Sequence, residues 1–345
     1  MGAVSEPLIQ WFELNRRLLP FRQEPSAYHI WVSEIMLQQT RVSAALPYYE
    51  RFVAELPDPA ALAACDPDKL RKLWQGLGYY SRVANMQKAA QIVCRQYGGQ
   101  LPADYAALRA LPGIGDYTAG AIASIAFGIP APAVDGNVLR VAARVTGDEG
   151  DIAAPATKKR VTAALAEIIP LDAPGDFNQA MMELGATVCL PNGAPLCDFC
   201  PARAFCTARL TGRTGQLPVK AAKKARRVEE RTVFLIFHEN RVALRRRPGR
   251  GLLAGLWEYP NELSPAGDAL ARWGIAPASL RSAGTGKHIF THIEWRMSAL
   301  AAEASSPALP EGWVWADRAA LAREYAVPNA FQPFQGAVEE RLGHF

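Results

Sequence analysis

The chain has 345 residues, 50% of them hydrophobic and 21% charged, which is an ordinary globular composition with room for two domains. Its net charge of +5 permits a nucleic-acid partner without demonstrating one. No run of about 18 apolar residues occurs, and the charged first 20 residues lack the apolar core of a signal peptide, so we expect a cytoplasmic protein.

The first 206 residues are predicted to be mostly helical. Apolar residues recur there with a period near 3.6, and Gly- and Pro-rich turn sequences separate the periodic segments. These segments are 28–46, 68–74, 82–97, 103–111, 116–127, 136–146, 158–169 and 177–188.

The first long segment carries a carboxyl group among apolar residues. Residues 30–37 are apolar on nearly every face, and Glu34 lies inside that run. Burial there would raise its pKa and suit a general acid at neutral pH. The alternatives are that Glu34 faces solvent or pairs with Arg41 or Arg82.

Two positions at helix starts are candidates for anion chemistry. In LPGIG, residues 111–115, Gly113 and Gly115 allow a tight turn whose bare N–H groups suit a phosphate, although a plain helix–helix corner has the same sequence. Asp135 precedes another helical run, so it is a natural N-cap. Such a fixed carboxylate could also stabilise a cationic transition state.

Four of the six cysteines fall within 18 residues, at Cys189, Cys197, Cys200 and Cys206. Four thiolates on one short loop can surround one metal centre. The compact loop favours a [4Fe–4S] cluster, and a structural zinc site remains open. Either centre would have all four ligands from the protein, so the chemistry is expected elsewhere.

Beyond the cysteines the pattern changes. Residues 207–228 contain many Lys and Arg and no acid, which is typical of a solvated tether or of a basic strap along a phosphate backbone. From residue 229 the sequence predicts strands, including a hairpin turning at Glu239–Asn240 and a strand over 288–300. Helical stretches near 264–273 and 317–325 complete an α+β domain.

Taken together, these motifs resemble the helix-hairpin-helix DNA glycosylases, and within them the MutY family. The matching stretches are SEIMLQQT (33–40), GLGYYSR (76–82), LPGIGDYTAGAI (111–122), VDGNVLRV (134–141), FNQAMMELGA (177–186), HIFTH (288–292) and the four cysteines. Two departures are a first cysteine gap of seven residues where the family has six, and Thr291 where the family has Ser.

The resemblance implies a mainly α helix-hairpin-helix glycosylase domain with an iron–sulfur loop over residues 1–206, a basic linker over 207–228 and an α+β MutT/Nudix-like domain over 229–345. A Nudix hydrolase needs a helix bearing several glutamates for its metals. Residues 249–274 lack such a helix, although they contain Glu258, Glu262 and Asp268. We therefore expect this domain to recognise a base without hydrolysing nucleotides.

The resemblance also implies a reaction. A monomeric base-excision-repair enzyme would flip adenine, mispaired with 8-oxoguanine or guanine, out of double-stranded DNA. Glu34 would protonate N7 of the adenine, Asp135 would stabilise the oxocarbenium-like sugar, and water would complete the hydrolysis. Tyr117 and Asn137 would orient the two carboxyl groups, and a [4Fe–4S] cluster would be the cofactor.

Further residues match family positions that contact bases. Arg22 and Gln179 would hold the adenine edge, unless they are an ordinary surface charge and an exposed helix residue. The residues that would fill or wedge the gap in the duplex, or read the oxidised guanine, are Gln39, Thr40, Tyr79, Phe290, Thr291 and His292. Core packing, or ordinary burial on a strand, is the alternative for this group.

Two other functions remain possible. An endonuclease III-like glycosylase would act on oxidised pyrimidines, but that branch places a lysine nucleophile where this chain has Tyr117, which cannot form a Schiff base. A DNA-binding or structural module that carries a cluster and has no enzyme activity is the third possibility.

Overall fold

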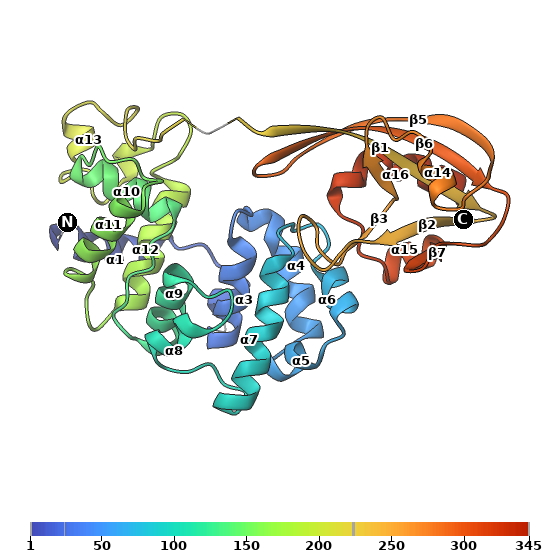
Figure 1. The fold of residues 1–345 in the computed structure, drawn as a ribbon. Helices are drawn as coiled ribbons and strands as arrows, with labels where there is room; N and C mark the ends of the chain where they lie inside the picture. Colours follow the sequence, from blue (N-terminus) through green and yellow to red (C-terminus); the bar gives the residue numbers. More distant parts are fainter. Residues whose placement is uncertain (1, 24, 223–224, 344–345) are drawn as a thin grey trace. The chain divides into compact units, whose positions relative to one another are not determined.

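The structure is a computed structural model that describes residues 2–23, 25–222 and 225–343 (Figure 1). The chain forms two compact units, one of Met1–Ala64 with Asn85–Ala222 and one of Cys65–Ala84 with Lys223–Phe345. Within the described ranges, no helix has both the length and the apolar composition that crossing a membrane requires.

The first unit is helical, as the sequence predicts. Its helices are α1 (Ser5–Asn15), α2 (Pro20–Gln23), α3 (Ala27–Leu37), α4 (Val42–Glu55), α5 (Pro59–Ala64), most of α7 (Ser81–Tyr97), α8 (Tyr105–Ala110), α9 (Asp116–Phe127), α10 (Gly136–Thr146), α11 (Pro155–Ala166), α12 (Pro174–Thr187) and α13 (Thr207–Leu210), with two short 3₁₀ turns at Gly2–Val4 and Cys197–Phe199. The prediction of one helix over 28–46 is wrong, because the chain leaves helical geometry at residues 38–41, where Gln39 has a φ of 60°.

Helix α12 lies at the centre of this unit. It contacts α1, α9 and α10, and α3 contacts α9. The shared core includes Phe12, Val138 and Leu184, all fully buried or nearly so. Because every one of these helices is apolar on its inner face, burying those faces together fixes their order around α12.

The turn between α8 and α9 requires glycine at one position. Gly113 has a φ of 79°, and a Cβ there would lie 2.8 Å from the Cβ of Asn85. Both its backbone conformation and the lack of space therefore exclude a larger residue. Gly115 follows as the N-cap of α9, with no side chain to cap the helix. The predicted helix–turn–helix over LPGIG is confirmed.

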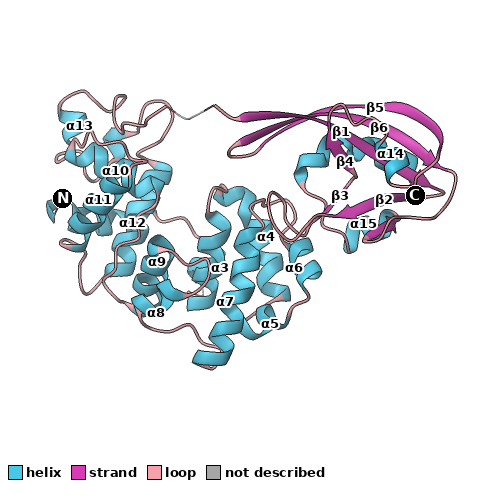
Figure 2. Ribbon diagram, in the orientation of Figure 1, coloured by secondary structure: helices cyan, strands magenta, loops and turns pink. Residues whose placement is uncertain are grey.

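The second unit is built around one seven-stranded mixed sheet (Figure 2). Its elements are α6 (Pro67–Leu73), β1 (Arg227–His238), β2 (Arg241–Arg246), β3 (Trp257–Glu258), β4 (Asn261–Leu263), α14 (Ala269–Arg272), β5 (Pro277–Ile289), β6 (Ile293–Ala304), β7 (Trp313–Ala316), α15 (Arg318–Arg323), a 3₁₀ helix (Asn329–Phe334) and α16 (Gln335–Arg341). The strand order is β3-β2-β1-β6-β5, with β4 on β1 and β7 on β2. β1 and β6 are parallel, and the other pairs are antiparallel.

The hairpin predicted at Glu239–Asn240 is confirmed, because His238 pairs with Arg241 across it. The single strand predicted over 288–300 is wrong. β5 ends at Ile289, β6 begins at Ile293, and the two strands pair antiparallel around a three-residue turn. Alternating burial continues through both strands of a hairpin, so periodicity alone does not reveal a turn without Gly or Pro.

Candidate active site

The structure buries Glu34 on helix α3. Ser26 caps this helix by accepting a hydrogen bond from the backbone N–H of His29. Six of the eight residues at positions 30–37 are apolar, and the other two are Ser33 and Glu34. Glu34 is only 7% exposed, so the alternative that it faces solvent is wrong. Most of the apolar residues of this run are therefore buried together with the carboxyl group.

Tyr117 of α9 contacts the same carboxyl group. Its hydroxyl donates a hydrogen bond to Oε2 of Glu34 and lies 3.3 Å from the sulfur of Met182. Burial raises the pKa of Glu34 to about 7, although the Tyr117 hydrogen bond opposes that rise. The negative charge of Asp135 raises the Glu34 pKa further, and the positive charge of Arg22 lowers it. Near neutral pH the carboxyl group therefore exchanges its proton readily.

Asp135 is the N-cap of α10, as its position before a helical run predicts. Its Oδ1 accepts a hydrogen bond from the backbone N–H of Val138 at 2.8 Å, and its Oδ2 accepts one from Nδ2 of Asn137 at 2.8 Å. Burial raises the Asp135 pKa, and these hydrogen bonds counteract that rise. The two carboxyl groups are near enough for the charge of Asp135 to act on Glu34, and Tyr117 is near both.

Sequence reasoning missed a second buried carboxylate. Glu183, on α12, is 1% exposed and binds Arg17 and Arg22 together. The Arg22 guanidinium lies 2.9 Å from Oε2 of Glu183 and also packs over the ring of Phe12. Arg22 is thus not an ordinary surface charge, and its partner is more than 160 residues away in the chain. Only a charge inside the apolar run of 177–188 hinted at this site.

A second missed residue, Arg140, connects the Asp135 cap with the cysteine loop. Its guanidinium donates to Oδ1 of Asn137 at 2.8 Å and to the carbonyl of Gly185 at 2.6 Å. Its Nε donates to the carbonyl of Cys189 at 2.8 Å. The loop that carries the thiols therefore helps to fix the residue that orients Asp135.

The four predicted metal-ligating cysteines line a single cavity. Nη1 of Arg144 lies 3.2 Å from the sulfur of Cys189, which gives a thiolate there a cationic partner. Burial raises the pKa of Cys200 to about 11, and the other cluster cysteines add to that rise because they lie close together. In the described ranges, no three His, Cys, Asp or Glu side chains converge tightly enough for a single metal ion. Four thiols that line one cavity match the donor set of an iron–sulfur cluster.

The remaining candidates of the first unit lie on α12 and after α3. Gln179 is half-buried on α12, so it is not fully exposed. Gln39 is exposed in the break between α3 and α4, with the positive φ noted above, and Thr40 beside it is half-buried. Core packing therefore does not explain Gln39.

In the second unit, two predicted base-contacting residues meet. Tyr79 is 47% exposed and has a φ of 46°, and its hydroxyl lies 3.2 Å from Oγ1 of Thr291. Thr291 and His292 are exposed at the turn between β5 and β6, whereas Phe290 packs against Trp295 with ring centroids 4.9 Å apart. Thr291 and His292 thus present polar groups from a turn that the Phe290 side chain anchors.

The end of the basic segment holds this turn. Nε of Arg226 donates to the carbonyl of Phe290 at 3.1 Å, and the backbone N–H of Arg227 donates to the carbonyl of His292 at 3.1 Å. Residues 223 and 224 of the predicted linker lie outside the described ranges, and β1 already begins at Arg227.

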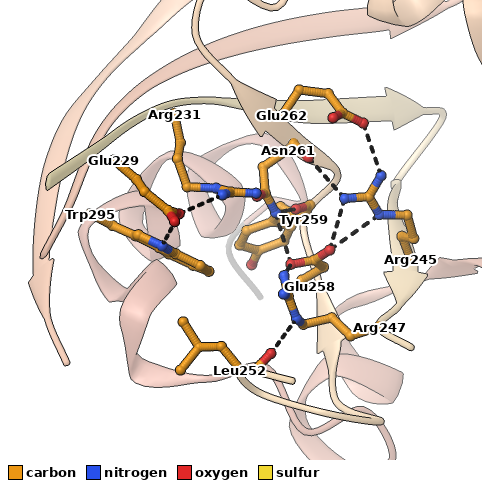
Figure 3. A network of polar contacts seen from close by, with 10 residues as sticks. All are labelled: Glu229, Arg231, Arg245, Arg247, Leu252, Glu258, Tyr259, Asn261, Glu262 and Trp295. Carbon is orange, nitrogen blue, oxygen red and sulfur yellow. Dashed lines mark hydrogen bonds and ion pairs between the residues drawn. The ribbon is translucent and has the colours of Figure 1, made fainter. Parts of the chain in front are cut away.

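The acidic residues of 249–274 are bound by arginines (Figure 3). Glu258 is 1% exposed and accepts hydrogen bonds from Arg245 at 2.9 Å, Arg247 at 2.5 Å and Asn261 at 2.8 Å. Glu262 pairs with the same Arg245 at 3.4 Å. Helix α14 is one turn long, and Arg272 in it pairs with the third acid, Asp268. Only Glu258 of these three acids is buried, and each of the three carboxylates has an arginine partner in place of a metal ion.

Comparison with known proteins agrees with this architecture. Residues 32–171 match the family described as HhH-GPD superfamily base excision DNA repair protein, and residues 232–335 match the NUDIX domain. The adenine DNA glycosylase of Homo sapiens is 34% identical over 97% of this chain and 74% of its own length. That of Buchnera aphidicola subsp. Acyrthosiphon pisum is 35% identical, covering 74% of this chain and 73% of its own.

Among solved structures, a thermostable thymine-DNA glycosylase superposes with a TM-score of 0.55 and 26% identity, over 61% of this chain and 96% of its own. That likeness supports the helical fold of the first unit. The relatives that match along most of the chain are named adenine DNA glycosylases. The chain therefore belongs to the adenine DNA glycosylase family.

Proposed function

We propose that this protein removes adenine mispaired with 8-oxoguanine or guanine from duplex DNA, as a monofunctional N-glycosyl hydrolase in base excision repair. The observation that carries the proposal is a buried carboxyl group, Glu34, with a pKa of about 7, beside a second carboxylate in a chain of this family. A duplex base reaches a buried acid only after it leaves the stack.

Glu34 acts as the general acid. Its Oε2 accepts the Tyr117 hydrogen bond, so Oε1 carries the proton that is transferred to N7 of the flipped adenine. Protonation makes adenine a neutral leaving group, and the bond between its N9 and C1′ of the sugar breaks with the electron pair going to the base. A carboxyl group with a pKa near 7 is protonated in about half of the molecules at neutral pH.

Asp135 stabilises the cationic sugar that remains. Its hydrogen bonds from Val138 and Asn137 favour the ionised form, so an anion faces the oxocarbenium-like C1′. Water then adds to C1′ and gives up a proton, which completes the hydrolysis. Tyr117 stands where a lyase would need a lysine, so no Schiff base forms and the DNA strand stays intact.

A [4Fe–4S] cluster held by Cys189, Cys197, Cys200 and Cys206 is the proposed cofactor. When bound, it ties the loop that carries these residues into one unit. The chain's own part is the Arg140 contact, which couples the position of that loop to the orientation of Asn137 and Asp135.

We expect the purified protein to be brown, with a broad visible absorption band and about four irons per chain. Cys200→Ser should lose the colour and most of the iron, because one of four ligands is gone, while Cys94→Ser, far from the cavity in sequence, should keep both. A colourless protein with one zinc ion per chain would contradict the iron assignment.

The Thr291 turn is proposed to read the base opposite adenine. Single-turnover excision should be fastest with 8-oxoguanine opposite adenine, slower with guanine and slowest with cytosine. Thr291→Val replaces the hydroxyl with a methyl group and keeps the shape of the side chain. It should slow excision opposite 8-oxoguanine about two- to tenfold, as expected for one lost hydrogen bond. Excision opposite guanine should change less.

Thr285→Val is the matched control, since Thr285 is an exposed threonine on β5 away from the turn. Equal effects of both variants, or equal rates for all three opposite bases, would contradict this reading of the second unit.

A further inference from the structure

Glu183 is a buried charge for which the proposed chemistry has no direct use. The carboxylate receives Nε and Nη2 of Arg17 at 2.5 and 2.9 Å, and Nη2 of Arg22 at 2.9 Å. The backbone N–H of Arg17 adds a longer contact at 3.3 Å. Four donors thus converge on one side chain that is 1% exposed.

These contacts fix the segment that precedes α3, the helix that carries Glu34. Residues 16–23 contain only one helical turn, α2, and Arg22 on that turn also donates to the carbonyl of Arg17 at 3.2 Å. A buried ion pair contributes little net stability, because desolvating both charges costs about as much as their attraction returns. What the Glu183 contacts do provide is a defined position for two long cationic side chains, of which Arg22 belongs to α2, a helix that contacts α3.

We propose that Glu183 is a positioning residue for adenine excision: it binds Arg17 and Arg22, and it fixes and offsets the positive charge of Arg22, which acts on Glu34. The inference rests on the proposed function, since it treats Glu34 as the acid. It assigns Glu183 an indirect role through the two arginines and places no contact between Glu183 and the substrate.

The charges around Glu34 determine the sign of the expected effect. The groups that act on it are Tyr117 from α9, Asp135 before α10 and Arg22 from α2. Glu183 lies against Arg22, so its negative charge weakens the positive field that Arg22 exerts on Glu34. Neutralising Glu183 makes the surroundings of Glu34 more positive and lowers the Glu34 pKa, whereas neutralising Arg22 makes them less positive and raises that pKa.

An acid catalyst works when protonated, so its rate is present below its pKa and is lost as pH rises through it. The single-turnover rate of wild-type protein should therefore fall above a pH of about 7. In Glu183→Gln the pH midpoint of the rate should move down by about half a pH unit or more. At pH 8 this shift alone lowers the rate roughly threefold relative to wild type, whereas at pH 6 it has little effect. In Arg22→Met the midpoint should move up.

Two further variants make the test specific. Glu183→Asp keeps the charge with a shorter reach, so it should lower the rate evenly across pH and leave the midpoint in place. Glu167→Gln, an exposed glutamate at the end of α11, should match the wild type in rate and midpoint. If Glu183→Gln does not fold, Glu183→Asp and Arg22→Met still carry the comparison.

A midpoint that stays in place in both Glu183→Gln and Arg22→Met would overturn the inference. That result would not contradict the proposed function. The proposed function has its own test: the wild-type rate should fall above neutral pH, and the residual activity of Glu34→Gln should not show that fall. Full activity in Glu34→Gln would instead remove the proposed function itself. The two failures are therefore distinguishable.

Discussion

Glu34→Gln is expected to lower the single-turnover rate of adenine release by about 100- to 10,000-fold, the usual contribution of a positioned general acid. Glutamine has nearly the same shape and still offers an oxygen to the Tyr117 hydroxyl, so the residues around position 34 should keep their arrangement. It cannot give a proton to a purine. Adenine would then have to leave as an anion, which is the poorer leaving group.

The measurement is excision from a duplex with adenine opposite 8-oxoguanine, with enzyme in excess, alongside thermal unfolding and DNA affinity. The matched control is Glu13→Gln, an exposed glutamate on α1, which should behave as wild type. The variant should unfold at a temperature no lower than wild type, since a buried ionisable group is replaced by a neutral one. Unchanged excision by a folded, DNA-bound variant would remove Glu34 from the mechanism.

The sequence predicts the two carboxyl groups that are proposed to be catalytic, because each lies in a local pattern with a physical meaning. Glu34 interrupts an apolar run long enough to be buried on all sides, and Asp135 stands at a helix start where its side chain must accept backbone hydrogen bonds. The cysteine spacing is equally local. Each of these features depends on neighbours within one or two helical turns.

The parts that the sequence does not predict depend on distant pairs. Glu183 lies 161 residues from Arg22, and Arg140 lies 49 residues from the Cys189 carbonyl that it binds. No periodicity marks such partners, because any long cationic side chain can reach a carboxylate once the fold brings them together. A sequence pattern therefore finds a buried acid more easily than the charges that tune its pKa.

Distant contacts also explain the two wrong predictions of secondary structure, the single helix over 28–46 and the single strand over 288–300. The break between α3 and α4 contains no Pro or Gly, so the apolar period runs through it. The turn at Phe290, Thr291 and His292 likewise has no typical turn residue, and its shape comes from the Trp295 ring and from the contacts of Arg226 and Arg227. In both places tertiary contacts replace local turn chemistry, and both places carry residues proposed to touch DNA.

Asp135→Asn separates the structural role of this residue from its chemical role. Asparagine caps helices about as well as aspartate, so the Val138 hydrogen bond should survive and stability should change by less than about 1 kcal/mol. The negative charge that faces the developing sugar cation is lost, and the single-turnover rate should fall by about 100- to 1,000-fold, as for other preorganised electrostatic contacts.

Loss of the Asp135 charge also removes an influence that raises the Glu34 pKa. The residual activity should therefore fall at a lower pH than in the wild type, because Glu34 loses its proton earlier. Asp104→Asn is the matched control, since Asp104 caps α8 by accepting a hydrogen bond from the backbone N–H of Ala107 at 2.7 Å. That variant should keep the wild-type rate and pH midpoint. If Asp135→Asn unfolds readily while Asp104→Asn does not, Asp135 serves mainly to cap its helix; if both are stable and equally active, the carboxylate has no part in stabilising the cation.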